Sequence, residues 1–148
     1  GIAGRLGGAT AQKITPNTGS TYCEVYQPRT YPVGTRTVRR GMVIKGDDVD
    51  AGLLMAYSTS LAEWMNAFFN MRTPQYEKSE PQGDDYVMNN VRMQKRENGF
   101  YLVYYDLTFA TNDTFSIVPT NMTGPWGITG NGSRGLIVDE VFEYPLTV

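Results

Sequence analysis

The sequence predicts a mainly β protein, an antiparallel β-barrel or sandwich with one flanking amphipathic helix at about residues 60–71 and an extended N-terminal arm. Three observations predict this fold class. The 148 residues include 16 glycines and 8 prolines, only 19% of them are charged, and several segments alternate apolar with polar side chains. A chain of this length forms one ordinary domain, so we expect a flexible arm over residues 1–20 and a single β-rich domain over residues 21–148.

The N-terminal arm is rich in glycine, alanine and threonine. Its sizeable apolar anchors are Ile2, Leu6 and Ile14. So few apolar side chains offset little of the entropy lost on ordering, which argues against a packed element. We expect the arm either to be disordered or to become ordered by lying across a neighbouring subunit.

Two strands are expected after the arm, at Thr21–Tyr26 and Thr35–Lys45, because both segments are rich in β-branched and aromatic residues. A turn that contains Pro28 and Pro32 separates them. Gly41 lies within the second strand, where a glycine indicates a bulge or the close approach of another backbone.

The predicted helix begins with Ser60-Leu61-Ala62-Glu63, which has the pattern of a capping box. The apolar residues with the spacing of one helical face are Leu61, Trp64, Met65, Phe68 and Phe69. This pattern predicts a helix over about 60–71 whose apolar side packs on a sheet. Residues 72–85 contain two prolines, a glycine and mixed charges, which predicts a solvated loop.

The next two strands are expected to form a hairpin. Every odd position of Tyr101–Phe109 is apolar, and the apolar residues of the preceding strand, Val87, Val91 and Met93, are odd as well. Odd positions of one strand must therefore lie opposite odd positions of the other, because a register shift by one residue would expose one apolar face.

The length of the connecting loop sets this register. A two-residue Asn98-Gly99 turn would place odd positions opposite even ones. A three-residue loop, Glu97-Asn98-Gly99 with Gly99 in the left-handed conformation, satisfies the pattern. It predicts that Met93 pairs with Val103 and Val91 with Tyr105.

Two further strands are expected, at about Thr114–Val118 and Leu136–Val148. The apolar residues expected to share one face of the last strand are Leu136, Val138, Phe142, Tyr144, Leu146 and Val148. Between these strands, residues 119–134 form a long glycine-rich loop with Met122, Trp126 and Ile128. A long loop with large apolar side chains is usually functional, and the alternative is that Trp126 folds back onto its own core.

The residue inventory argues against an enzyme. The chain has no histidine and one cysteine, Cys23, so serine–histidine and cysteine–histidine catalytic sites and histidine-based zinc sites cannot be built. Asp47, Asp48 and Asp50 are followed by no carboxylate at the bidentate position of an EF-hand loop. We expect no catalytic, cofactor-binding or metal site. No apolar stretch approaches the ~20 residues of a membrane span, so no membrane span is expected.

The charges divide unevenly along the chain. Residues 1–45 hold seven cations and one glutamate, a balance of +6, while residues 46–148 hold six cations and fourteen carboxylates, a balance of −8. Such a division fits identical copies that dock through surfaces of opposite sign, or a basic segment that binds nucleic acid. Arg36, Arg39 and Arg40 form the main basic cluster, and the outer face of a strand is an equally simple place for them.

The order of the expected elements resembles that of the tail-tube proteins of long-tailed bacteriophages, whose fold is shared with the secreted tube protein of type VI systems. The resemblance covers residues 21–148: two N-terminal strands, the second with Arg40-Gly41, a helix bearing Trp64, the Val87–Phe109 hairpin, a Gly/Pro/Trp loop and a closing strand. The long loop at 119–134 departs from the family pattern.

The resemblance implies a virion protein, made in the host cytoplasm, that carries no catalytic residues. Six copies would close a ring, and stacked rings would form a tail tube through which DNA passes without sequence-specific binding. The expected partners are copies of itself and other virion proteins. The candidate subunit-interface residues are Ile2, Leu6, Arg36, Arg39, Arg40, Asp47, Asp48, Asp50, Met122, Trp126 and Ile128.

Two other functions fit the same composition. A capsid decoration or stabilising protein would assemble as trimers on a shell instead of stacked rings. A monomeric carbohydrate-binding β-sandwich would use Trp126 and neighbouring loop residues as a sugar platform.

Overall fold

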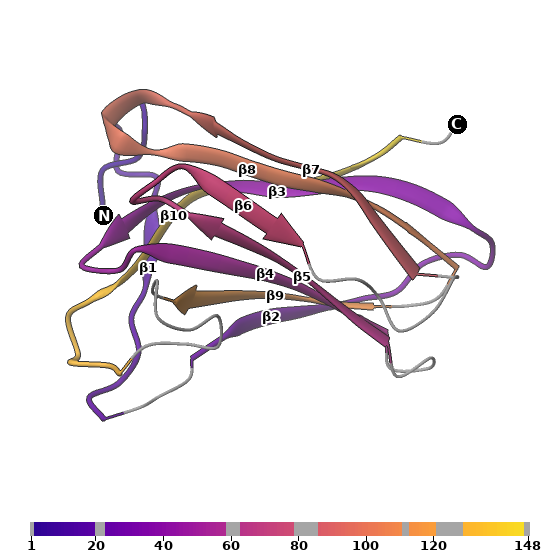
Figure 1. Ribbon diagram of the computed structural model, residues 1–148, viewed down its shortest axis with the longest axis horizontal. Helices are drawn as coiled ribbons and strands as arrows, with labels where there is room; N and C mark the ends of the chain where they lie inside the picture. Colours follow the sequence, from indigo (N-terminus) through magenta and orange to yellow (C-terminus); the bar gives the residue numbers. More distant parts are fainter. Residues whose placement is uncertain are drawn as a thin grey trace.

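A computed structural model describes residues 2–19, 23–58, 63–78, 86–110, 113–120 and 129–146. The described strands form two antiparallel five-stranded sheets, which lie as two layers (Figure 1). In spatial order the first sheet contains β1 (Gln12–Ile14), β10 (Gly135–Pro145), β3 (Arg36–Asp47), β8 (Tyr101–Phe109) and β7 (Tyr86–Lys95). The second contains β2 (Val25–Arg29), β9 (Asp113–Thr120), β4 (Ala51–Ser58), β5 (Glu63–Asn70) and β6 (Gln75–Lys78).

The strands pair in a nested order. β1 pairs with β10, β2 with β9, β3 with β8, and β4 with β5. The chain therefore folds as one long hairpin wrapped around itself, which is the arrangement of a jelly roll. β6 and β7, which follow β5 in the chain, extend the two sheets and contact each other along one side of the sandwich. The predicted mainly β, antiparallel sandwich is confirmed, and the strands that the structure describes do not close into a barrel.

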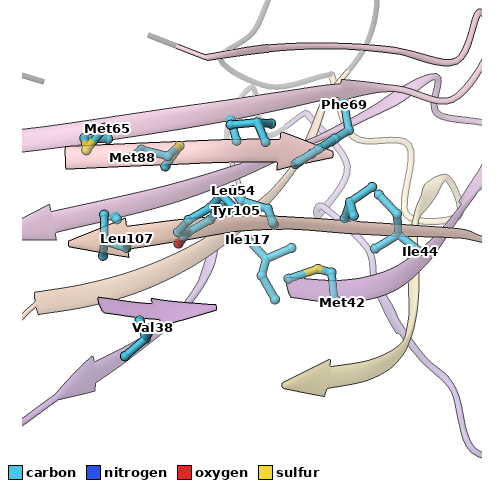
Figure 2. Packing of buried hydrophobic residues seen from close by; sticks show 14 of the residues in the cluster. Val38, Met42, Ile44, Leu54, Met65, Phe69, Met88, Tyr105, Leu107 and Ile117 are labelled. Carbon is cyan, nitrogen blue, oxygen red and sulfur yellow. The ribbon is translucent and has the colours of Figure 1, made fainter. Parts of the chain in front are cut away.

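The hydrophobic core lies between the two sheets (Figure 2). Alternate residues of the strands that line the core point into it, as the period of two of a β-strand requires. The first sheet contributes Val38, Met42, Ile44, Met88, Val103, Tyr105 and Leu107, among others, and the second contributes Leu54, Ala56, Met65, Ala67, Phe69 and Ile117. Each large apolar side chain buried here is worth roughly 1.5–3 kcal/mol of transfer free energy.

The prediction of a helix over residues 60–71 is wrong for the described part, because residues 63–70 form strand β5. This strand pairs with β4 on one side and β6 on the other. Met65, Ala67 and Phe69 alternate into the core, so the segment satisfies the period of a strand as well as that of a helix. Pairing with the apolar neighbouring strand β4 decides between them. Residues 60–62 of the capping box lie outside the described residues.

The N-terminal arm is also not the free segment that the composition predicted. Gln12–Ile14 pairs with β10 as β1, and Ile2 forms a bridge with Ala11. Backbone pairing at the edge of a sheet holds this segment in place although it has few apolar side chains. Composition does not predict such pairing.

The neighbouring strand β2 also differs from its predicted bounds. It runs through Pro28, which lies on a sheet edge where its missing N–H is tolerated. Residues 21–22 of the expected strand lie outside the described residues. The predicted solvated loop at 72–85 includes strand β6.

The β7–β8 hairpin follows the predicted register at its loop end. Met93 pairs with Val103, and Gly99 adopts a φ of 78° in the connecting turn. The expected pair of Val91 with Tyr105 is interrupted by a register shift between Asn89 and Arg92. Both Val91 and Tyr105 nevertheless face the core.

The last strand, β10, contains a bulge at Asp139 that overturns one prediction. Val138 pairs with Ile44, but Glu140 pairs with Val43. The one extra residue in β10 therefore reverses which face of the sheet each later side chain of the strand occupies. Leu136 and Val138 face inward, whereas Phe142 and Tyr144 lie opposite Gly41 and Arg39 on the outer face. The apolar residues of this strand therefore do not share one face.

Candidate interaction surfaces

The outer face of the second sheet is unusually apolar. Strand alternation turns Leu54 and Ala56 into the core, so Leu53, Met55 and Tyr57 face outward on the same strand. Phe68 is the partner of Leu53 in register, and Tyr26 lies in the row of Met55 across β9. We call these five residues, Tyr26, Leu53, Met55, Tyr57 and Phe68, the apolar outer face.

The exposure of this face varies along it. Leu53 is buried and Met55 and Phe68 are partly buried, while Tyr57 is 37% and Tyr26 62% exposed. Strand β4 is almost continuously apolar in sequence, which is typical of strands that are covered on both sides. That run is the sequence signal that the interface prediction missed.

The three clustered arginines do not form one basic surface. Arg40 points into the sandwich with a 1% exposed side chain, because it occupies the inward position between Val38 and Met42 on β3. Arg39 faces outward and lies over the ring of Tyr104 at 4.5 Å. Arg36 lies over the ring of Tyr31 at 4.7 Å. The expectation that all three are available at the surface is therefore wrong for Arg40.

Arg39 is held by Asp106 on the neighbouring strand β8. The guanidinium donates two hydrogen bonds to this carboxylate, from Nε at 2.8 Å and from a terminal nitrogen at 3.0 Å. Asn90 donates a third at 2.8 Å. Burial by itself would raise the pKa of Asp106, but the bonds from Arg39 and Asn90 outweigh it and lower this pKa.

Arg40 is part of a polar network inside the sandwich. Its Nε donates to Glu143 Oε2 at 2.8 Å, and its terminal nitrogens donate to the hydroxyls of Tyr31 and Tyr105 at 3.1 and 3.3 Å. The Tyr31 hydroxyl and Arg29 also donate to Glu143. Burial opposes ionisation of Glu143, yet the charge of Arg40, the Tyr31 bond and Arg29 together lower its pKa.

The segment around Arg5 is tied across the end of the first sheet. Arg5 donates its backbone N–H to the bulged Asp139, and its guanidinium reaches Glu97 at 3.2 Å and Glu140 at 3.3 Å. Thr10 also donates to Asp139. Leu6, one of the predicted anchors, is 73% exposed, whereas Ile2 is partly buried.

The acidic candidates lie near the end of β3 and have partners within the chain. Lys13 is paired with Asp47 at 2.6 Å. Arg134 donates two hydrogen bonds to the backbone carbonyl of Asp48. The carbonyl of Asp50 accepts a bond from the N–H of Met71. The remaining candidates, Met122, Trp126 and Ile128, lie outside the described residues.

A groove runs between the two sheets on the side where β1 and β2 form their edges. It has a volume of about 510 Å³. Its aliphatic lining consists of Ile14, Val25, Ile117, Val138 and Val141, and its polar lining of Thr10, Gln12, Lys13, Thr15, Cys23 and Asp139. A smaller cavity of about 240 Å³ adjoins it at Val141 and is lined by Gln27, Arg29, Arg40, Phe142 and Glu143.

These features define a jelly-roll sandwich with an apolar outer face and an inter-sheet groove. No protein-family model matches the chain, and no curated protein sequence matches it. Over the described ranges, no helix is long and apolar enough to cross a membrane, and no cluster of three or more cysteine, aspartate or glutamate side chains has the arrangement of a metal site.

Proposed function

We propose that this chain is a virion structural protein, a subunit that assembles with copies of itself into a viral shell. The observation that carries the proposal is the apolar outer face of the second sheet. A sheet that is apolar on both sides is stabilised when a second layer covers its outer side. Tyr26 and Tyr57 leave part of this side exposed, and exposed apolar surface favours association. A second copy of the chain is the partner that repeats at every position of a shell.

The topology supports the same proposal by analogy of fold. Jelly rolls occur in viral capsid proteins, lectins and cupins. Because a fold hosts many functions, this analogy supports the virion proposal only together with the apolar outer face. The shell is preferred to the tail tube, because the resemblance to tube proteins included a Trp64-bearing helix and Trp64 lies in strand β5.

The three clustered arginines are engaged in contacts within the chain. Arg40 is enclosed, Arg39 is paired with Asp106, and Arg36 lies over Tyr31. Contacts between copies are instead expected to be mainly apolar. Their strength should therefore persist at high salt, where exposed ion pairs are screened over ~8–10 Å or less.

Assembly of the purified chain tests the proposal. We expect sedimentation and negative-stain microscopy at high protein concentration to show closed particles, and Tyr57→Glu to give a folded protomer that does not assemble. Val33→Glu is the matched control, because Val33 is a fully exposed apolar residue away from this face. A wild-type chain that stays monomeric, or a Tyr57→Glu chain that assembles normally, would contradict the proposal. Tubes or stacked rings would favour the tail, and trimers would favour a decoration protein.

A further inference from the structure

The interior of the sandwich is incompletely filled on the β1–β2 side. Val25 pairs with the buried Ile117 and Val141 pairs with the buried Met42, so the register points both valines inward. Their side chains are nevertheless 50% and 55% exposed. At the opposite side of the sandwich β6 and β7 contact each other. The groove between β1 and β2 is therefore an apolar part of the interior that is open to solvent.

The size and lining of the groove fit a small ligand. Its volume of about 510 Å³ falls within the roughly 300–1,000 Å³ that is usual for small-molecule sites. Five aliphatic side chains from four strands line it, and polar side chains line it as well, among them Gln12, the register partner of Val138. An elongated aliphatic group would cover the exposed halves of Val25 and Val141, which gains roughly 25 cal/mol per Å² of apolar surface removed from water.

Among the described residues, two guanidinium groups lie at the end of the groove near Arg29. The adjoining cavity contains two guanidinium groups, those of Arg29 and Arg40, and one carboxylate, that of Glu143. Arg40 is enclosed, whereas the side chain of Arg29 is 38% exposed and contacts Glu143 with one terminal nitrogen at 3.0 Å. Arg29 is therefore the guanidinium group that a ligand can reach.

We propose that this groove binds a single-chain amphiphile, with an aliphatic tail along Val25, Val138 and Val141 and a carboxylate head at Arg29. A free fatty acid has this chemistry. An added peptide strand fits less well, because Pro28 interrupts the free edge of β2 and lacks the N–H that such a strand would need. A neutral sugar would gain nothing from the charge and little from branched aliphatic walls.

The single cysteine of the chain provides a direct probe of occupancy. Cys23 lines the groove and is partly buried, and burial together with the charge of Glu24 raises the pKa of its thiol. At mildly alkaline pH, we expect dodecanoate below its micelle concentration to slow the reaction of Cys23 with a thiol reagent in a saturable way. Dodecyltrimethylammonium at the same concentration should give little protection, because its cationic head is repelled by Arg29.

Variants separate the tail site from the head site. Val141→Trp fills the groove and should weaken dodecanoate binding by about tenfold or more, measured by titration calorimetry, while Val33→Trp, a fully exposed valine elsewhere, should not. Arg29→Gln should weaken binding of dodecanoate but not of dodecanol. Val25→Trp replaces Val141→Trp if circular dichroism shows that the latter is unfolded.

Several results would overturn this proposal. They are dodecanoate binding that does not saturate, a Cys23 reaction rate that dodecanoate leaves unchanged, unchanged affinity in the groove-filling variant, or equal binding of the carboxylate and ammonium amphiphiles. Binding to anionic phospholipid vesicles without binding to free dodecanoate would assign the surface to a membrane instead. None of these measurements depends on assembly, so the result is independent of the proposed shell function.

Discussion

Arg40 and Glu143 lie directly opposite each other on β3 and β10 and form an ion pair inside the sandwich, with 2.8 Å between Nε and Oε2. The Arg40 side chain is 1% exposed and that of Glu143 16% exposed. A buried ion pair of this kind contributes little relative to well-packed apolar residues, but removing one partner leaves an uncompensated charge. The contribution of the pair to stability is therefore measured by removing one partner.

We predict that Glu143→Gln lowers the free energy of unfolding by about 3 kcal/mol at neutral pH, because the enclosed Arg40 keeps its charge and loses the carboxylate that it contacts. The folded-state pKa of Glu143 lies below its ordinary value of 4.5, so its contribution is fully present above pH 4.5 and is lost as the pH falls through the folded-state pKa. Urea unfolding of both proteins at pH 7 and pH 3 checks this. The difference in free energy of unfolding between the wild-type chain and Glu143→Gln should be smaller at pH 3 than at pH 7.

Glu140→Gln is the control for this comparison. Glu140 lies on the same strand as Glu143, its side chain is half exposed, and it pairs with Arg5 of the N-terminal segment. Its loss should cost at most ~1 kcal/mol, the usual range for surface pairs. An equal effect of the two substitutions, or a Glu143→Gln effect that does not depend on pH, would contradict the role assigned to the interior pair.

A second prediction concerns the turn between β7 and β8. Asn98 and Gly99 have φ values of 54° and 78°, the left-handed region that favours glycine and asparagine. Gly99→Ala should lower the free energy of unfolding by about 1 kcal/mol in urea, although an added Cβ would have space. Asn98→Gly should leave stability unchanged or raise it.

Insertion of one residue between Glu97 and Asn98 should lower the free energy of unfolding by several kcal/mol, because it shifts the register of the hairpin.

Gly41 is required for a different reason, the close approach of the neighbouring strand and side chains. A Cβ at this position would clash with the carbonyl oxygen of Val103 and lie 2.8 Å from Phe142 Cζ. Gly41→Ala should therefore lower the free energy of unfolding by about 1–3 kcal/mol, the usual cost of overpacking. Gly8→Ala, whose Cβ would meet nothing closer than 3.7 Å, is the control and should have little effect in the same unfolding assay.

The N-terminal segment provides a fourth prediction. Deleting residues 1–20 removes the β1 ladder and the contacts of Arg5 with Asp139, so the midpoint of thermal unfolding should fall by several degrees even in dilute protein. Leu6→Ser, at an exposed position of the same segment, should leave the midpoint unchanged. If the truncated chain melts like the full chain, the segment is dispensable for folding and its role lies in assembly alone.

Several features of this protein follow from local sequence. The alternation in Tyr101–Phe109 identifies its buried face, and parity with the preceding strand predicts the three-residue loop and the pair of Met93 with Val103. Gly41 marks a close backbone approach. These features depend on residues that are near in sequence or on the side-chain period of a single strand, which a pattern of apolar residues reports directly.

Only the tertiary structure decided three other features. Residues 63–70 satisfy both helical and strand periods, and pairing with β4 and β6 selects the strand. The bulge at Asp139 is held by Arg5 and Thr10, more than a hundred residues away, and it reverses the facing of Phe142 and Tyr144. Arg40 is enclosed because Glu143 and two tyrosine hydroxyls meet it between the sheets. In each case a partner outside the segment decides, and the periodicity of one segment contains no information about such partners.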